Sequence, residues 1–140
     1  MARSKNEFYR KVGEILMKLS NERLVNSIGV LSKLTNMELP IKLSYAFSKN
    51  ITKIVRELTA YNKERQKLIE KYGERNKEGK LNIKENETIN ILDIDKFNKD
   101  LKEILEIETE VDIHLIDLDK INADINITPG ELMIIDYMFK

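Results

Sequence analysis

His114 is the only histidine in a chain of 140 residues, and acidic residues lie close to it. The surrounding segment alternates apolar and polar residues, which is typical of a strand and places Glu110, Asp112 and His114 on one face at steps of about 7 Å. A histidine beside two carboxylates can ligate a metal ion or exchange protons with a substrate. The chain offers no second histidine and no cysteine to complete such a site. We therefore favour a solvated strand face whose charge, with that of Asp117 and Asp119, balances a basic region elsewhere.

A second candidate metal site fails on spacing. Asn122, Asp124 and Asn126 resemble the opening of a calcium-binding loop. However, Ile127 stands where that loop needs glycine, and Met133 stands where it needs its final glutamate. The sequence also has no glycine-rich phosphate loop and no short motif of a metalloprotease or serine hydrolase. It therefore predicts a protein that is not an enzyme and that has no cofactor and no metal site.

Charge is divided between the two halves of the chain. Residues 1–80 carry 18 Lys and Arg against 9 Asp and Glu, a net of +9, whereas residues 81–140 carry 6 against 15, a net of −9. Either the halves face each other, within or between chains, or each offers one sign of charge to a partner. The sequence has no cysteine, no secretory signal and no apolar run near the roughly 20 residues of a membrane span. These features favour a cytoplasmic protein that does not contact membranes.

The N-terminal segment, residues 1–16, has two interpretations. The codons just before Met17 can resemble a bacterial ribosome-binding site with its spacer, so the segment could be a translated leader. The alternative is an extra amphipathic helix. Four apolar residues follow helical spacing: Phe8, Val12, Ile15 and Leu16.

Two helices are predicted in the basic arm, residues 17–80. The first spans 21–35, where a polar residue can cap the N-terminus and apolar residues recur at helical spacing. The second spans 40–72, which begins with a proline suited to the first turn and has no internal glycine or proline. Gly73 follows as a C-terminal stop signal.

The long helix carries a heptad pattern. Its apolar residues recur in steps of four and three, and they are Phe47, Ile51, Ile54, Leu58, Tyr61, Leu68 and Tyr72. Arg65 interrupts this stripe. One interpretation is that it marks a partner helix or a local opening of the helix packing, with a carboxylate of the acidic half as its counter-ion. The other is that its side chain simply extends its charge into solvent. The helix would span about 50 Å, more than the first helix can cover. We expect it to pack in a coiled coil or helical hairpin of a homo-oligomer, or the acidic half to fold back over it.

The acidic half, residues 81–140, mixes strand and helix signals. In order, its predicted elements are a hairpin (81–83 with 89–91), a helix (96–107), a third strand (111–115) and a short C-terminal helix. Asp95 can cap the first of these helices, and Thr128 opens a capping box for the second. The expected fold class is therefore α+β: an N-terminal helical arm with one long heptad-patterned helix, then a small antiparallel sheet with two short helices, all in one folded unit.

The basic arm could contact nucleic acid. Its positive side chains on and just after the long helix are Lys49, Lys53, Arg56, Lys63, Lys67, Lys71 and Arg75. The aromatic residues of this helix belong to the heptad stripe, and glutamates interrupt the positive face. A solvated helix face is therefore favoured over a nucleic-acid site.

Helix and turn signals recur along the chain in the segments Met17–Glu22, Leu39–Ala46, Leu68–Glu74, Lys77–Lys80 and Thr128–Met133. In this order they are similar to an uncharacterised family of small proteins encoded by tailed phages and prophages of low-GC Gram-positive bacteria. The resemblance covers residues 17–140 and begins at Met17, as the leader hypothesis expects. It implies a viral gene product, and no functional residue can be transferred from it.

These observations predict a phage-encoded binding protein in the bacterial cytoplasm. It would occupy a host or phage protein, as an inhibitor of a host defence system. The candidate interaction residues are Phe47, Ile51, Ile54, Leu58, Tyr61, Arg65, Leu68, Tyr72, Asp112, His114, Asp117 and Asp119. The acidic members could mimic a nucleic-acid surface toward a basic protein. The alternatives are a virion or tail assembly factor, a nucleic-acid binder, and a small-molecule sponge formed between subunits of an oligomer.

Overall fold

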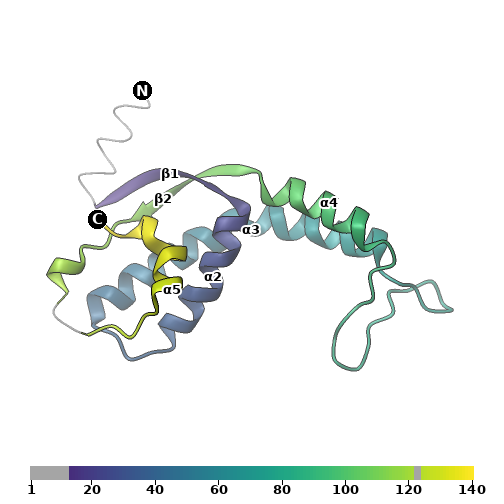
Figure 1. The fold of residues 1–140 in the computed structure, drawn as a ribbon, viewed down its shortest axis with the longest axis horizontal. Helices are drawn as coiled ribbons and strands as arrows, with labels where there is room; N and C mark the ends of the chain where they lie inside the picture. The colour runs from purple at the N-terminus through teal and green to yellow at the C-terminus, as the bar shows by residue number, and fades with distance from the viewer. Residues whose placement is uncertain (1–12, 122–123) are drawn as a thin grey trace. The chain divides into compact units, whose positions relative to one another are not determined.

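The computed structural model describes residues 13–121 and 124–140. The elements are β1 (Glu14–Ser20), α2 (Asn21–Thr35), α3 (Ile41–Tyr72), α4 (Ile94–Leu105), β2 (Glu108–His114) and α5 (Pro129–Ile135), with 3-10 turns at Leu118–Lys120 and Asp136–Met138 (Figure 1). The predicted α+β class, with one long helix and an antiparallel sheet, is confirmed. No helix among the described residues has the length and apolar character needed to cross a membrane.

The chain divides into two compact units. Unit 1 comprises the residues up to Leu58 together with Glu108–Lys140, and unit 2 is Thr59–Ile107. The boundary therefore falls inside α3 and again just before β2. This division does not follow the change of charge at residue 80.

The antiparallel sheet is formed by β1 and β2 alone, with Met17 opposite Val111. Residues 111–115 were expected to be a strand, and β2 covers all but the last of them. The prediction that this strand pairs with a hairpin in the acidic half is wrong, because it pairs with β1. Alternation shows that a segment is a strand but does not show which distant segment it pairs with.

The predicted helices of the first half are confirmed. α2 begins at Asn21, and the Ser20 hydroxyl accepts a hydrogen bond from the Arg23 amide at 3.1 Å. α3 runs without interruption to Tyr72, as the absence of internal glycine and proline predicts. The prediction of an extra N-terminal helix is wrong at Ile15 and Leu16, because both residues belong to β1. Phe8 and Val12 lie outside the described residues, and the start at Met17 stays a prediction.

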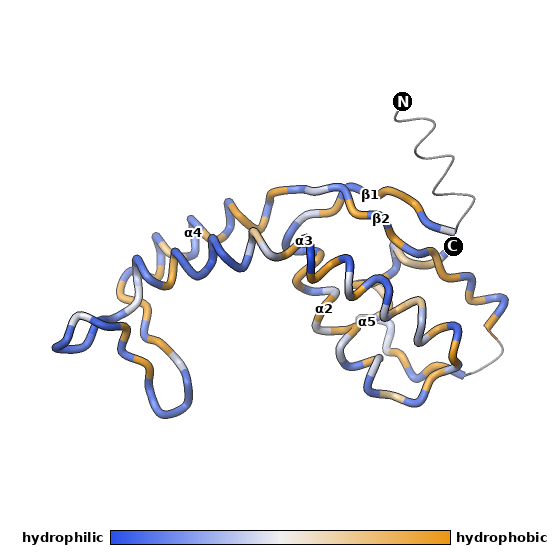
Figure 2. Tube along the Cα trace, turned by 180° about the vertical axis from the view of Figure 1, so that it is seen from behind, coloured by the Kyte–Doolittle hydropathy of each residue, from blue (hydrophilic) through white to orange (hydrophobic). Residues whose placement is uncertain are grey.

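In the second half, α4 begins earlier than predicted. The carboxylate of Asp93, not that of Asp95, accepts a hydrogen bond from the Lys96 amide at 3.3 Å and caps the helix. Figure 2 shows hydrophobic residues interspersed with hydrophilic ones along α4, and Phe97, Leu101 and Ile104 follow the steps of four and three that an amphipathic helix requires. The predicted capping box at Thr128 is confirmed by its reciprocal hydrogen bonds with Glu131, at 3.1 and 3.2 Å.

The segment between α3 and α4 is a loop held by isolated β-bridges, not a regular hairpin. Ile83 pairs with Ile89 as predicted, but Ile91 pairs with Gly73 at the end of α3. A β-carbon at Gly73 would lie only 2.5 Å from the carbonyl oxygen of Ile69 and 2.7 Å from Leu81. Only glycine permits this close return of the loop onto the helix end.

The hydrophobic core belongs almost entirely to unit 1. Of the seventeen apolar side chains that the described residues bury, fifteen lie in this unit, and Tyr61 and Phe97 are the two in unit 2. The largest of the fully buried side chains in unit 1 include Phe47, Leu24, Leu31, Leu34, Leu43, Ile54, Ile113, Ile135 and Met138. Unit 1 therefore has the burial of a folded domain, whereas unit 2 has two helices and a thin apolar contact between them.

Candidate functional site

The heptad stripe of α3 is covered by the chain itself over its first part. Phe47, Ile54 and Leu58 are buried within unit 1, and Ile51 is half-buried. Phe139 packs edge-to-face on Phe47, with 6.4 Å between ring centroids. These contacts agree with the fold-back interpretation, because they leave no apolar stripe here for a partner helix.

Within unit 2, α4 covers the end of the same stripe. Tyr61 is buried, and Leu68 and Tyr72 are half-buried. The Tyr72 ring packs edge-to-face on Phe97 with centroids 6.2 Å apart, and its hydroxyl donates a hydrogen bond to Asp100 at 2.8 Å. This hydrogen bond to the Asp100 carboxylate raises the pKa of Tyr72 above its ordinary value.

Arg65 lies on the wall of a hollow in unit 2. The hollow has a volume of about 460 Å³ and is lined by Arg65, Ile69, Glu87, Thr88, Ile89, Ile91 and Phe97. The expected counter-ion from the acidic half is wrong. Among the described residues, no carboxylate lies within ion-pair distance of the Arg65 guanidinium, and the guanidinium makes no hydrogen bond to them. Glu87, which lines the same hollow, adopts a positive φ of 63°. An exposed guanidinium thus stands beside isoleucine side chains and a phenylalanine.

Large apolar side chains are exposed elsewhere in the same unit. Their exposed fractions range from 52% to 66%, and they are Ile83, Leu92, Ile94 and Ile107. The loop after α3 accounts for two of them, and α4 with its C-terminal flank accounts for the others. Unit 2 therefore combines a small core with four exposed large apolar side chains.

The predicted acidic residues of β2 and its flank have different roles in the structure. Asp112 forms an ion pair with Lys53 at 3.0 Å. The Asp117 carboxylate accepts a hydrogen bond from the Asp119 amide at 3.1 Å and caps a 3-10 turn, whereas the Asp119 side chain is exposed. The prediction that this face of β2 is solvated is only partly correct, because Asp112 and His114 are half-buried. These carboxylates do not form one free acidic surface.

His114 is held by Asn50, a fully buried residue of α3. The Asn50 side chain donates a hydrogen bond to the His114 carbonyl at 3.0 Å and accepts one from the His114 amide at 2.8 Å. These two backbone groups, on the edge of β2 that faces away from β1, therefore have partners. Burial, followed by the positive charge of Lys49, lowers the pKa of His114 below its ordinary 6.5. No cluster of three potential metal ligands occurs in the described part of the chain.

A buried charge cluster that sequence reasoning missed lies beside His114. The Glu14 carboxylate accepts hydrogen bonds from Lys53 at 2.7 Å and from Lys49 at 3.1 Å. Burial alone would raise the pKa of Glu14, but these two hydrogen bonds outweigh it and lower the pKa below its ordinary 4.5. The glutamate also raises the pKa of Lys49. No local pattern signals the cluster, because Glu14 and Lys53 are brought together only by the tertiary fold.

Opposite charges from the two halves meet within the chain. The ion pairs that join residues 1–80 to residues 81–140 in unit 1 are Lys53–Asp112, Arg23–Asp136 and Lys33–Glu131. On α3 and its end, Lys67 pairs with Glu64, and Arg75 pairs with Glu70. Part of the segregated charge is therefore paired within the chain.

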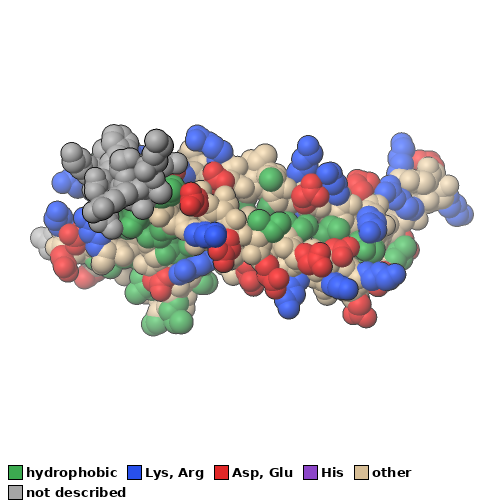
Figure 3. Space-filling view, turned by 90° about the horizontal axis from the view of Figure 1, so that it is seen from above, with side chains coloured by type: hydrophobic (Ala, Val, Ile, Leu, Met, Phe, Trp, Pro, Cys, Tyr) green, Lys and Arg blue, Asp and Glu red, His purple; other side chains and the backbone are tan. Residues whose placement is uncertain are grey.

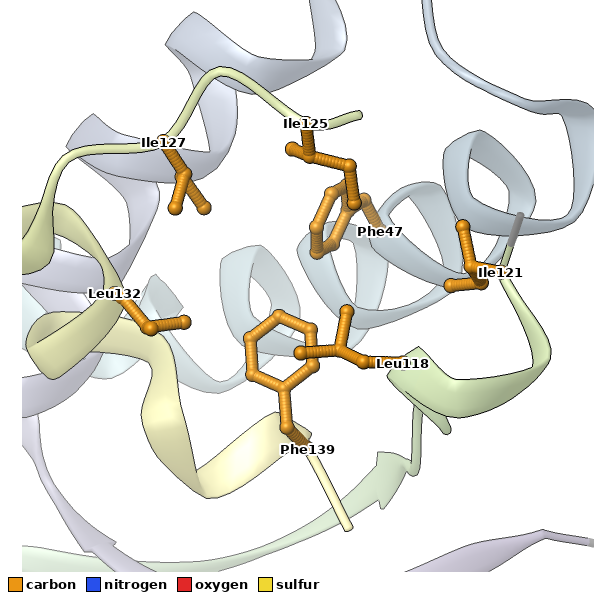
Figure 4. Close-up of a pocket in the computed structure, with 7 residues that line it drawn as sticks. All are labelled: Phe47, Leu118, Ile121, Ile125, Ile127, Leu132 and Phe139. Carbon is orange, nitrogen blue, oxygen red and sulfur yellow. The ribbon is translucent and has the colours of Figure 1, made fainter. Parts of the chain in front are cut away.

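Unit 1 contains another cavity, of about 230 Å³, whose lining side chains are all apolar. Figure 4 shows its seven side chains directed toward a common space, and they are Phe47, Leu118, Ile121, Ile125, Ile127, Leu132 and Phe139. They come from α3, from the irregular segment after β2, from α5 and from the C-terminal residues. No local sequence pattern signals this cavity, because its lining comes from segments far apart in the chain.

No protein-family model, curated protein or solved structure matches this chain. The resemblance to phage proteins therefore stays a prediction.

Proposed function

We propose that this chain is a non-enzymatic binding protein that acts by occupying another protein. The hollow of unit 2 is its contact surface, and Arg65 is the central contact. The observation that carries the proposal is a guanidinium with no counter-ion among the described residues, in a hollow where Ile89, Ile91 and Phe97 lie beside Glu87 and Thr88.

The chemistry of this hollow specifies the partner's side chains. A guanidinium binds a carboxylate through two parallel hydrogen bonds, and such pairs strengthen where water is excluded. Ile89, Ile91 and Phe97 provide the apolar surroundings. Arginine and large apolar side chains are also the residue types that dominate binding energy at protein interfaces. We expect a partner that presents a carboxylate next to an apolar side chain.

The resemblance to phage proteins supports a host setting for this partner. A phage product without catalytic residues is useful to the virus when it blocks a host protein, and we propose a cytoplasmic host defence component as the target. The structure favours Arg65 over the acidic residues as the contact, because Asp112 and Asp117 are engaged within the chain.

Two alternatives are less well supported. A nucleic-acid site on the basic arm would need free positive charge, but four of its seven candidate residues are paired with carboxylates, namely Lys49, Lys53, Lys67 and Arg75. Figure 3 shows positive and negative side chains interspersed over the face in view. An assembly factor would self-associate, which sedimentation of the purified chain tests directly.

The decisive experiment is capture of the target by the tagged full chain from host lysate, with nuclease present. Arg65→Glu reverses the charge in the hollow, and Lys63→Glu makes the same change at an exposed residue of α3 that does not line it. We expect one dominant protein with the wild type and with Lys63→Glu, and its loss with Arg65→Glu. Equal capture by both variants would contradict the proposal, as would capture that disappears with nuclease.

A further inference from the structure

The apolar cavity of unit 1 is distinct from the hollow of unit 2 and serves no step of the proposed function. Both aromatic rings of the pair Phe47–Phe139 lie on its wall, and aliphatic side chains complete it (Figure 4). Leu118 is 40% exposed, so the cavity wall reaches the protein surface. A solute can therefore enter without unfolding of the core.

The size of the cavity limits its occupant. An apolar cavity of about 150 Å³ lined by Leu, Ile and Phe stays dry and accepts benzene. The cavity here is about 230 Å³, which is large enough for one aromatic ring with a short substituent. A water molecule would be poorly held by these side chains, because an ordered water needs two to four polar partners.

The lining chemistry limits the charge of the occupant. None of the seven side chains is titratable or carries a hydrogen-bonding group. A charged or strongly polar group placed inside would lose its hydration without compensation. A neutral apolar group would instead gain dispersion contacts and release apolar surface from water.

We infer that this cavity is a binding site for a small uncharged apolar molecule, a single aromatic ring or a branched aliphatic group of similar size. The site belongs to unit 1, so it operates whether or not unit 2 binds a protein. Toluene is a neutral aromatic ring that fits the volume of the cavity. Benzoate has the same ring but carries a negative charge, so comparing the two molecules tests whether the cavity excludes charge.

The test is titration of the full chain, labelled at the Ile and Leu methyl groups, with toluene and then with benzoate, followed by NMR. We expect saturable shifts with toluene at Ile121, Ile125, Ile127 and Leu132, and none of these shifts with benzoate. If toluene produces no saturable shift, the cavity is not a small-molecule site and the inference is overturned.

Matched variants separate cavity binding from adsorption to the surface. Leu132→Trp fills the cavity, whereas Met133→Trp adds the same side chain at a neighbouring residue that is 73% exposed and does not line it. We expect loss of toluene binding only in the first variant. Should Leu132→Trp not fold, Leu132→Ala enlarges the cavity, and the preference should shift from toluene to naphthalene. Toluene binding that is equal in every variant would overturn the inference.

Discussion

Unit 1 and unit 2 share the helix α3 but use it in opposite ways. In unit 1 the helix presents Phe47 and Ile54 to a core that the sheet, α2 and α5 complete. In unit 2 it has a single neighbouring helix, α4, and of the apolar side chains there only those of Tyr61 and Phe97 are buried. The difference indicates that unit 1 is the stable scaffold and unit 2 a thinly packed contact surface, because local stability follows buried apolar contact.

The largest expected effect comes from the same substitution made once in each unit. Phe47→Ala removes a fully buried ring from unit 1 and should lower the free energy of unfolding by about 3–5 kcal/mol. Phe97→Ala removes a ring with few neighbours and should cost less than about 3 kcal/mol, with effects confined to unit 2. Urea unfolding and hydrogen exchange of both variants measure this, and equal global losses would remove the distinction between the units.

Asn50 provides the second test, because it completes the edge of β2 in unit 1. Asn50→Ala would leave the amide and carbonyl of His114 unsatisfied in a buried place, at a cost of about 2–4 kcal/mol. Asn62→Ala, at an exposed residue of the same helix in unit 2, should change stability by less than about 0.5 kcal/mol. Similar unfolding midpoints in denaturant for the two variants would contradict this assignment.

The Glu14 cluster makes the stability of unit 1 dependent on pH. The pKa of Glu14 is lowered in the folded chain, so its contribution is present above pH 4.5 and is lost as the pH falls through the folded pKa. Glu14→Gln should therefore cost about 1.5–3 kcal/mol at pH 7, and the difference from the wild type should vanish at low pH. Urea unfolding at a series of pH values tests this. Glu38→Gln, at an exposed residue, is the control, and a constant difference at all pH values would argue against the cluster.

The smallest effect is expected in unit 2. Tyr72→Phe removes the hydrogen bond to Asp100 but keeps the ring against Phe97. Because the hydroxyl is close to solvent, we expect a loss below about 1 kcal/mol, with faster exchange of the α4 amides as its main sign. Unchanged exchange in α4 would show that this contact does not hold the two helices together.

Local signals predicted most of the helices, and tertiary pairing accounts for the errors. The Ser20 cap, the Thr128 capping box and the uninterrupted residues of α3 act within one or two helical turns, so the sequence reveals them. The pairing of β1 with β2 joins opposite ends of the chain, and no periodicity in either segment encodes it.

The candidate site was predictable to a smaller extent. Arg65 stood out because it breaks a heptad pattern, and it does line a hollow. The opposite wall, with Ile89 and Ile91, was expected to form a hairpin. The Glu14 cluster and the apolar cavity depend on contacts between segments far apart in sequence, which single-sequence patterns do not report.

The central claim is that unit 2 binds the partner while unit 1 supports it. Hydrogen exchange of the full chain, alone and with the captured partner, tests this claim most directly. We predict that the partner protects amides of residues 85–98 and of the α3 turn around Arg65, and leaves the amides of β1, β2 and α2 unchanged. Protection confined to unit 1, with the hollow of unit 2 exchanging as in the free chain, would contradict the account.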